Sequence, residues 1–181
     1  MILSDSELVE MLREPRTRRE GFAVLVKQYS EKLYWKVRRI VLSHEDANDV
    51  LQNVFIKVWN NLQNFQGKSS LSTWLYRIAI NESLDFLRKL KQTDMVSSDE
   101  DLSVSSRLMS DEYFDGDEIQ ARLQEAVARL PEVQRTVFNL KYFEEMKYSE
   151  ISQILNTSEG ALKASYHLAV KKITEYLHSF D

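Results

Sequence analysis

Residues 148–173, YSEISQILNTSEGALKASYHLAVKKI, have the pattern of two helices joined by a tight turn. Ser149 and Ser158 stand where the two helices are expected to begin, and a serine hydroxyl there can accept a hydrogen bond from the first turn of a helix. Asn156 and Thr157 lie between the helices and are predicted to form the turn. The segment therefore predicts a helix-turn-helix in the C-terminal part of the chain.

The second of these helices has two different faces. Its apolar residues recur at three- and four-residue steps and form a stripe that we expect to be buried: Leu162, Tyr166, Ala169, Ile173 and Leu177. The opposite face carries a small residue, a histidine and two lysines: Lys163, Ala164, His167 and Lys171. A helix of this kind, preceded by a short helix and a tight turn, suits the major groove of DNA. A solvated face on a plain helical hairpin is the weaker interpretation, because both helices and the turn have their capping residues.

The rest of the chain is also predicted to be helical. Its 181 residues include 4 glycines and 2 prolines, and long runs of β-branched residues are few. With 43% hydrophobic residues a sizeable core can be buried, and we predict an all-α protein. The N-terminal residues lack the apolar core of a secretory signal, and no stretch approaches the roughly 18 apolar residues that span a bilayer. A cytoplasmic protein without membrane insertion is therefore expected.

Catalytic, metal and cofactor sites have no candidate residues. The sequence contains no cysteine, which excludes disulfides and thiol chemistry. His44, His167 and His178 have no metal-ligand spacing with one another. Four glycines cannot supply a phosphate-binding loop, and no serine lies in a nucleophile motif. We therefore expect no enzyme, no metal and no cofactor.

Charge is unevenly distributed along the chain, and this predicts two domains. Residues 1–91 carry a net charge of +4, residues 92–117 of −7 and residues 118–181 of −1, which gives −4 in all. The middle segment is rich in Ser and Asp and has no sustained apolar period. We interpret it as a flexible acidic linker between two small helical domains, an N-terminal bundle and the C-terminal helix-turn-helix. Alternatively, it contains a short amphipathic turn that docks on a partner or a domain, around Leu108, Met109, Tyr113 and Phe114.

Helical patterns in the N-terminal domain cover residues at roughly 4–14, 18–42, 45–62 and 70–91. The third helix has one apolar stripe, formed by Ala47, Val50, Leu51, Val54, Phe55, Val58 and Leu62. Its opposite side carries Ile56 and Trp59, which a solvated helix does not ordinarily expose. Either this side binds a partner, or Trp59 covers a helix–helix edge and Ile56 is a tolerated exposed residue. Periodicity alone does not decide between the two.

The fourth predicted helix keeps one polar strip. Trp74, Arg77, Asn81 and Arg88 share this face. The loop before them, FQGKSSLST at residues 65–73, places small polar groups beside aromatic rings. Aromatic rings with cations and hydroxyls suit a single nucleic-acid strand. Alternatively, Trp74 is a core ring and the basic residues only complement the negative end of the helix, and the residues alone favour this second interpretation.

Three stretches, taken in this order, resemble the extracytoplasmic-function group of bacterial sigma factors, the subunits that direct RNA polymerase to promoters. EDANDVLQNVFIKVW, at residues 45–59, is similar to the family's core-polymerase-binding helix. FQGKSSLSTWLYRIAINESLDFLRK, at residues 65–89, is similar to its promoter-melting segment. Residues 130–173, which include the helix-turn-helix, are similar to its C-terminal DNA reader. The resemblance covers nearly everything outside the linker and the extreme ends.

The resemblance implies partners and contact residues. The chain is expected to bind core RNA polymerase, through the clamp helices of its largest subunit, and promoter DNA, and an anti-sigma factor could be a further partner. Residues 1–91 would bind polymerase and recognise and melt the minus-ten element, and residues 118–181 would read the minus-thirty-five element. Polymerase contacts are expected from Asp46, Asp49, Gln52, Asn53 and Ile56. Minus-ten contacts are expected from Lys68, Ser69, Ser70, Thr73, Trp74, Arg77, Asn81 and Arg88. Minus-thirty-five contacts are expected from Ser158, Glu159, Lys163, His167 and Lys171.

The sequence also departs from the family in its last helix. Family members often carry arginine where this chain has Ser165, Leu168 and Val170, so a low isolated affinity for DNA is expected. Leu168 could touch a thymine methyl group or pack against an inhibitory partner. The alternative function is a stand-alone helix-turn-helix regulator or adaptor, which would need neither a strand-capture loop nor a polymerase-binding helix. A third functional class is a purely structural helical protein. This class requires that the chain binds no nucleic acid, either alone or together with a partner.

Overall fold

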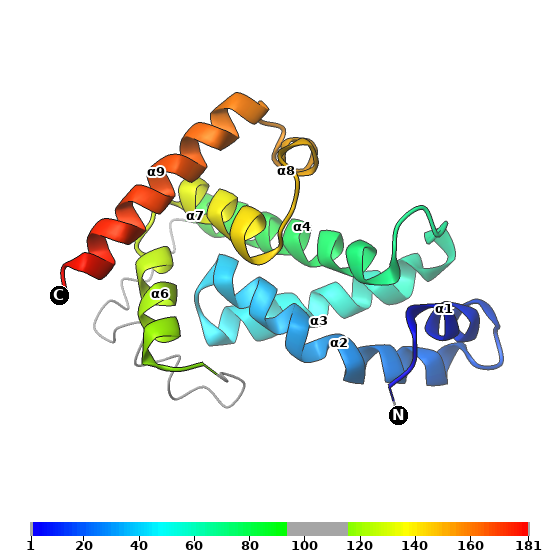
Figure 1. Cartoon of the computed structure of the whole chain (residues 1–181). Helices are drawn as coiled ribbons and strands as arrows, with labels where there is room; N and C mark the ends of the chain where they lie inside the picture. Colours follow the sequence, from blue (N-terminus) through cyan, green and yellow to red (C-terminus); the bar gives the residue numbers. More distant parts are fainter. Residues whose placement is uncertain (1, 94–115, 181) are drawn as a thin grey trace. The chain divides into compact units, whose positions relative to one another are not determined.

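The computed structural model describes residues 2–93 and 116–180 (Figure 1). Every regular element in these two ranges is helical, which confirms the predicted all-α fold. Contacts divide the chain into two compact units, Met1–Val96 and Ser97–Asp181, and each is described by itself. Most of the predicted linker, 92–117, lies outside the described residues, and so does the amphipathic turn considered within it. No helix in the described ranges is long and apolar enough to cross a membrane.

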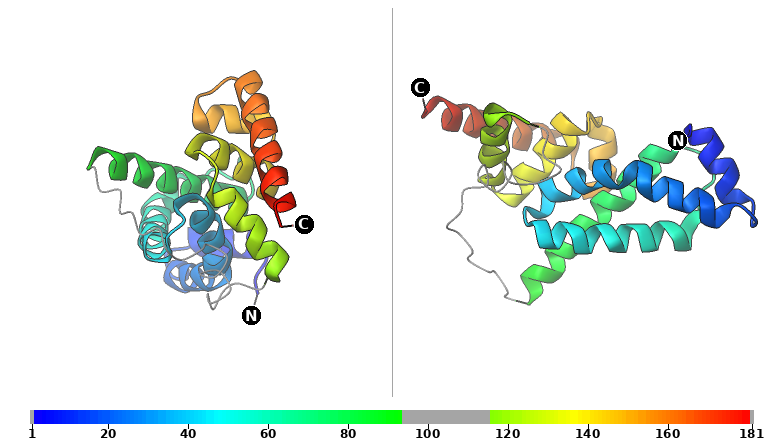
Figure 2. Two further views of the ribbon diagram at one scale, coloured as in Figure 1. Left: turned by 90° about the vertical axis from the view of Figure 1, so that its left-hand side faces the viewer. Right: turned by 90° about the horizontal axis from the view of Figure 1, so that it is seen from below.

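The N-terminal unit contains α1 (Asp5–Arg13), α2 (Arg18–Val41), α3 (His44–Asn61), the short 3₁₀ helix η1 (Leu62–Asn64) and α4 (Leu71–Gln92). Helices α2, α3 and α4 pack against one another in pairs, and α1 packs against α2, η1 and α4 (Figures 1 and 2). The four helices predicted from periodicity begin and end within one residue of the observed α1 to α4. Their common core contains Leu25, Leu33, Val50, Val54 and Leu75, each 1% exposed or less.

Serine side chains cap three of these helices. The Ser4 hydroxyl accepts from the Glu7 N–H at 3.3 Å, and the Glu7 carboxylate accepts from the Ser4 N–H at 2.8 Å. At α3, the Ser43 hydroxyl accepts from the third helical N–H at 3.4 Å, and at α4 the Ser70 hydroxyl accepts from the Thr73 N–H at 3.2 Å. These bonds satisfy amide groups that have no partner within the helix, so they fix where each helix begins.

The C-terminal unit contains α6 (Glu118–Ala128), α7 (Glu132–Phe138), the π-helical turn η2 (Asn139–Phe143), α8 (Tyr148–Leu155) and α9 (Glu159–His178). Helix α9 packs against α6, α7 and α8, so it is the central helix of the unit. A buried cluster joins α6, α7 and α9 and contains Ala126, Val127, Leu130, Phe138, Ala169 and Ile173. The sequence patterns predicted α8 and α9 but did not identify α6 as a separate helix.

One predicted cap is wrong and one is confirmed. Ser149 does not cap α8, because this helix begins at Tyr148 and its capping residue is Lys147, whose backbone N–H donates to the Glu150 carboxylate at 3.0 Å. The acidic side chain, which reaches back from the first turn, satisfies the capping amide without a serine. Ser158 caps α9 as predicted, since its hydroxyl accepts from the third helical N–H at 3.3 Å. Asn156 ends α8 in the left-handed conformation, with φ 51° and ψ 47°, and forms the predicted turn.

Candidate functional site

The outer face of α3 is the first candidate surface. Asp49, Gln52, Asn53 and Ile56 are exposed there, and 58% of Ile56 is accessible to solvent. The opposite side of α3, which packs against α2 and α4, carries the buried residues Ala47, Val50, Val54 and Val58. The predicted polymerase contacts therefore share one exposed face, with a large apolar side chain among polar ones. Such an arrangement is typical of a protein interface, in which an apolar centre has a polar rim.

Trp59 and Ile56 turn out to have different roles in the fold. The Trp59 ring packs edge-on against the Phe22 ring of α2, with centroids 5.0 Å apart and planes at 67°. It is 39% exposed and so covers the edge between α2 and α3, as one of the two interpretations expected. Ile56 lies one turn earlier on α3 and is 58% exposed, so of these two side chains it is the better candidate for contact with a partner.

Asp46 begins the same face and is held in an unfavourable environment for a carboxylate. Partial burial and the nearby negative charge of Asp49 raise the pKa of Asp46 above its ordinary value, and Glu45 adds to this effect. A hydrogen bond with Ser43 lowers the pKa but does not compensate. The start of α3 thus concentrates negative charge that a cationic partner surface would stabilise.

The second candidate surface runs from the loop before α4 along that helix. Trp74 is half-buried, and its ring packs against Phe65 with centroids 5.1 Å apart and planes at 49°. Lys68, Arg77, Asn81 and Arg88 are exposed, and the Arg88 guanidinium forms an ion pair with Asp85 at 2.7 Å. The structure therefore brings an aromatic pair, a basic loop residue and the polar strip of α4 to one side of this unit.

The hydroxyl groups of this surface are already engaged in starting α4. The Ser70 hydroxyl donates to the Thr73 hydroxyl at 2.8 Å, and the Ser69 hydroxyl donates to the Ser70 carbonyl oxygen at 3.3 Å. Ser69, Ser70 and Thr73 thus have a structural role in shaping the loop, and their contact with DNA stays a prediction.

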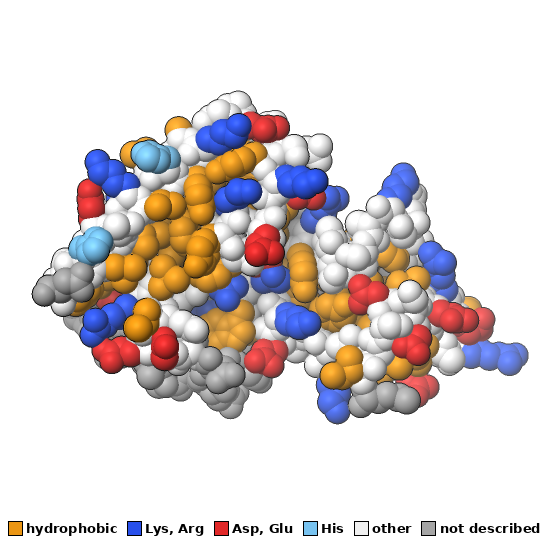
Figure 3. Space-filling view, in the orientation of Figure 1, with side chains coloured by type: hydrophobic (Ala, Val, Ile, Leu, Met, Phe, Trp, Pro, Cys, Tyr) orange, Lys and Arg blue, Asp and Glu red, His pale blue; other side chains and the backbone are white. Residues whose placement is uncertain are grey.

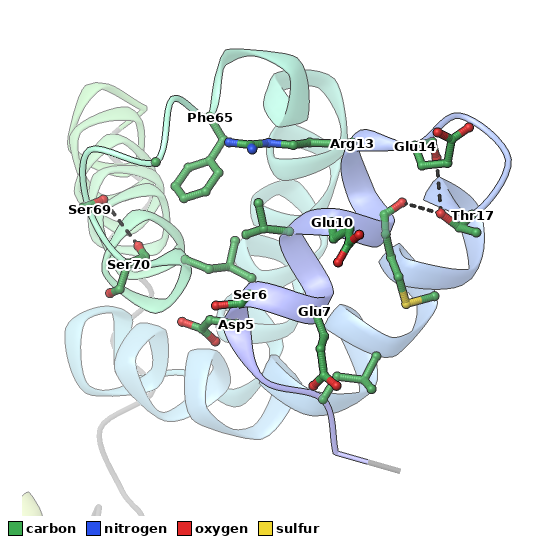
Figure 4. Close-up of a pocket in the computed structure, with 15 residues that line it drawn as sticks. Asp5, Ser6, Glu7, Glu10, Arg13, Glu14, Thr17, Phe65, Ser69 and Ser70 are labelled. Atoms are coloured by element: carbon green, nitrogen blue, oxygen red, sulfur yellow. Dashed lines mark hydrogen bonds between the residues drawn. The ribbon is translucent and has the colours of Figure 1, made fainter.

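A groove of about 1090 Å³ lies between this loop and α1 (Figure 4). Phe65, Gly67 and Ser70 contribute from the loop side, and Asp5, Glu10 and Arg13 are among the residues from α1. Gly67 has a φ of 69°, which favours glycine, and a β-carbon there would lie 3.8 Å from a guanidinium nitrogen of Arg13. Sequence patterns gave no signal for α1 as a neighbour of the loop, because only the tertiary packing brings them together.

Asp5 ties α1 to the rest of this surface. Its carboxylate accepts from the Tyr29 hydroxyl of α2 at 2.5 Å and from the Ser72 N–H in the first turn of α4 at 3.4 Å. Burial, followed by the hydrogen bond with Asp5, raises the pKa of the Tyr29 hydroxyl, so tyrosine stays a donor over the physiological range. One carboxylate therefore braces the helix that begins directly after the loop.

The third candidate surface is the outward face of α9, called here the reading face and formed by Ser158, Glu159, Lys163, His167 and Lys171. All five are exposed, while Leu162, Ala169 and Ile173 on the opposite side are buried, as the sequence predicted. Tyr166 belongs to the core side, since its ring stacks on Phe138 with centroids 5.8 Å apart and planes at 15°. The predicted faces of this helix are thus confirmed.

Apolar side chains also reach the surface of this unit. Leu168 is 46% exposed and Val170 38%, next to the reading face. Figure 3 shows hydrophobic side chains gathered in a band along α9, with basic side chains at its margins. Exposed apolar side chains therefore lie beside the predicted DNA contacts.

Comparison with known proteins identifies two matching regions. The family model described as "Sigma-70 region 2" matches residues 25–93, and the one described as "Sigma-70, region 4" matches residues 120–173. The ECF RNA polymerase sigma factor SigW of Bacillus subtilis is 32% identical over 82% of this chain and 84% of its own length. The RNA polymerase sigma-H factor of Pseudomonas aeruginosa is 31% identical over 96% of this chain and 93% of its own length.

Solved structures show the same fold. The sigma factor RpoE of Bartonella quintana, solved with the anti-sigma factor NepR, gives a TM-score of 0.66 at 21% identity, over 88% of this chain and 98% of that one. CnrH, solved with the cytosolic domain of CnrY, gives a TM-score of 0.62 at 19% identity, over 98% of this chain and 96% of that one. Both cover the two helical units described above.

Proposed function

Because the chain belongs to the sigma-70 family of RNA polymerase sigma factors, and within it to the extracytoplasmic-function group, we propose that it uses one surface to bind polymerase and two others to recognise the promoter. The chain is an alternative sigma factor that directs promoter-specific transcription initiation. A stand-alone regulator is not favoured, since the relatives that cover most of the chain are sigma factors. Each of the three candidate surfaces has a separate task in this proposal.

In this proposal the α3 face attaches the chain to core RNA polymerase. Asp46, Asp49, Gln52, Asn53 and Ile56 would contact the clamp helices of the largest subunit. The exposed Ile56 supports this role most directly, because 58% of a large apolar side chain is accessible in the middle of a polar face. Negative charge at the start of α3 would then be stabilised by cationic groups of the partner.

The loop before α4 and the polar strip of α4 would capture the opened minus-ten strand. An unpaired base needs a ring to stack on, and the Phe65–Trp74 pair, with centroids 5.1 Å apart, offers one. Lys68, Arg77 and Arg88 would attract the backbone, and Asn81 would bond to a base edge. Residues 1–91 thus serve polymerase binding and melting, with Ser69, Ser70 and Thr73 shaping the loop.

The reading face of α9 would enter the major groove at the minus-thirty-five element, which makes residues 118–181 the second DNA-binding domain. The support is the exposed and capped N-terminal half of α9, since recognition helices contact base edges with their first residues. Ser158, Glu159 and His167 can donate or accept at base edges, and Lys171 supplies charge farther along.

The net charge of −4 is compatible with this task. An acidic chain is not attracted to DNA at long range, so polymerase would supply the nonspecific affinity and this subunit the local discrimination. In that division of work the chain carries out no catalytic step, and it acts in the cytoplasm, where polymerase and promoters are found. The acidic segment 92–117 would join the two domains.

An anti-sigma factor is part of the proposal as a regulatory partner. Among the similar solved structures, RpoE is in complex with the anti-sigma factor NepR, and CnrH is in complex with the cytosolic domain of CnrY. On this chain, the exposed Leu168 and Val170 give such a partner an apolar place to bind beside the reading face.

Transcription from genomic DNA tests the proposed function. Core polymerase is incubated with and without the purified chain, and transcript start sites are mapped by sequencing. The proposal expects a new set of starts that share two upstream elements at one spacing. A set of starts that shares only the upstream element would refute strand capture by the N-terminal domain.

A further inference from the structure

Every α-helix of the described ranges except α4 has an acidic residue in its own first turn. The first N–H groups of a helix have no partners within it, and they favour a negative charge nearby. At α4 this charge comes from another helix, because the Asp5 carboxylate of α1 accepts a hydrogen bond from the Ser72 N–H at 3.4 Å. The start of α4 is therefore completed by a residue 67 positions earlier in the chain.

Asp5 is itself held in place by α2. Its other carboxylate oxygen accepts from the Tyr29 hydroxyl at 2.5 Å, and Tyr29 is buried. The neighbouring Gln28 binds the backbone just before α1, since its side-chain amide donates to the Leu3 carbonyl oxygen at 2.9 Å and accepts from the Leu3 N–H at 3.1 Å. Two consecutive residues of α2 thus fix the first turn of α1, and with it the carboxylate that faces α4.

The loop before α4 meets α1 at a second point. Arg13, in the last turn of α1, has a guanidinium nitrogen 3.8 Å from the place that a β-carbon of Gly67 would take. Both residues line the groove between α1 and the loop (Figure 4). Helix α1 therefore borders the loop at Gly67 and, through Asp5, the first turn of α4 directly after the loop. The position of the loop thus depends on the position of α1.

We propose that Asp5 is a positioning residue for strand capture. Through Ser72 it holds the start of α4, and the loop before it, in the geometry that receives the opened minus-ten strand. This inference rests on the proposed function of that loop. Asp5 does not contact the strand, because a carboxylate would repel its phosphates, and Tyr29 contributes by holding Asp5. A loop that has the receptive geometry for only a fraction of the time binds the strand more weakly by that fraction.

The test uses the chain bound to core polymerase and a single-stranded oligonucleotide with the minus-ten sequence recovered from the start-site mapping. Its dissociation constant is measured by fluorescence anisotropy. Asp5→Ala loses two hydrogen bonds and should weaken strand binding about tenfold. Asp5→Asn and Tyr29→Phe are milder changes, and each should weaken it about threefold. Co-elution with core polymerase should be unchanged in all three variants, because the outer face of α3 is intact.

The direction of the effect separates positioning from charge. If electrostatics alone acted, removal of a negative charge near a nucleic-acid site would strengthen strand binding. Glu10→Gln is the charge control, because Glu10 is exposed on α1 and lines the same groove. It should bind the strand at least as tightly as the wild type. Strand binding by Asp5→Asn that equals or exceeds that of the wild type would overturn the proposal.

A stability control separates positioning from a general weakening of α1. Ser4→Ala removes the hydroxyl that caps α1 and should lower the thermal midpoint, but it keeps the Asp5 carboxylate. Its strand binding should therefore stay close to that of the wild type. If Ser4→Ala and Asp5→Ala lower the midpoint equally and also weaken strand binding equally, Asp5 acts only through stability and the proposal is refuted.

Hydrogen exchange follows the loop directly. Backbone amides of residues 66–73 should exchange faster in Asp5→Ala than in the wild type, and at the wild-type rate in Ser4→Ala. Unchanged exchange in Asp5→Ala would show that the carboxylate does not hold this segment. The double variant of Asp5→Ala and Tyr29→Phe should bind the strand as Asp5→Ala does, because the tyrosine acts through Asp5. Fully additive losses would contradict that link.

Failure of this inference differs from failure of the proposed function. If Trp74→Ala and Asn81→Ala weaken strand binding while Asp5→Ala does not, only the positioning role is refuted. If Asp5→Ala speeds exchange at residues 66–73 and none of the three variants weakens strand binding, the loop does not capture the strand.

Discussion

The Trp59 ring lies edge-on against the Phe22 ring, with centroids 5.0 Å apart, and this contact joins α3 to α2. It assigns Trp59 to the fold, whereas Ile56, one turn away, is 58% exposed. The two side chains look alike in the sequence pattern of α3. Their different environments predict different consequences for stability and for binding.

Replacing Ile56 with glutamate should weaken polymerase binding and leave the fold intact. The substitution puts a charge into the apolar centre of the α3 face, which we expect to cost tenfold or more in affinity, that is about 1.4 kcal/mol. Gln52→Glu, on the same face, should act in the same direction. Co-elution of the chain with core polymerase measures the effect, and unchanged co-elution of a folded variant would refute the assignment.

Trp59→Ala should instead lower stability. Because the ring is partly exposed, the expected loss is about 1–2 kcal/mol, less than for a fully buried tryptophan. Ile56→Ala should stay within about 0.5 kcal/mol of the wild type. Thermal unfolding followed by circular dichroism compares the two variants. Equal midpoints for Trp59→Ala and the wild type would show that the contact with Phe22 contributes little.

Asp46→Asn should stabilise the free chain at neutral pH. The raised pKa of Asp46 means that ionisation costs more in the folded state than in the unfolded state. The wild type is relieved of this cost when the carboxyl is protonated, so the advantage of the variant should fade as pH drops through the raised pKa toward about 4. Denaturant unfolding at several pH values checks this, and an advantage that grows toward acid pH would contradict it.

Asn81→Ala should spare duplex binding and reduce promoter opening. Asn81 is exposed on the α4 strip, where a base of the opened strand would be held. Loss of one base-edge contact should lower opening by about tenfold, measured as permanganate reactivity of promoter thymines. Trp74→Ala should lower opening as well, since it removes the ring beside Phe65. Asn60→Ala, exposed on α3, is the matched control, and reactivity equal to this control in both variants would count against strand capture.

His167→Ala and Lys171→Ala should weaken transcription from promoters that depend on the upstream element. His167→Ala should change the sequence preference for the upstream element, because an imidazole can form a hydrogen bond with a base edge. Lys171→Ala should mainly reduce the salt dependence of promoter binding. Run-off transcription from promoters with intact and scrambled upstream elements separates these effects. Equal losses on both templates would place the reading face elsewhere.

The helices were largely predictable from sequence because their boundaries depend on local groups. Ser43, Ser70 and Ser158 cap the helices that follow them, and the apolar stripes of α3 and α9 are buried as their period required. The cap of α8 was mispredicted because a glutamate reaching back from the first turn replaced the expected serine. That choice depends on side-chain geometry, which a residue pattern does not contain.

The sites were less predictable because they depend on contacts between distant segments. The distinction between Ile56 and Trp59 required Phe22, and the bracing of α4 by Asp5 joins residues 67 positions apart. Lys141 and Lys163 both lie against the Tyr148 ring, and these three residues come together only through the packing of η2, α8 and α9. A sequence period describes one helix at a time, so such tertiary relations do not appear in it.

The central claim is that discrimination comes from this chain and nonspecific affinity from polymerase. Permanganate reactivity of thymines on one promoter fragment tests it most directly, with core polymerase alone, the chain alone and both together. The account predicts reactivity at the minus-ten element only when both are present, and loss of that reactivity with Ile56→Glu. Equal reactivity with core polymerase alone, or none with both folded components present, would contradict it.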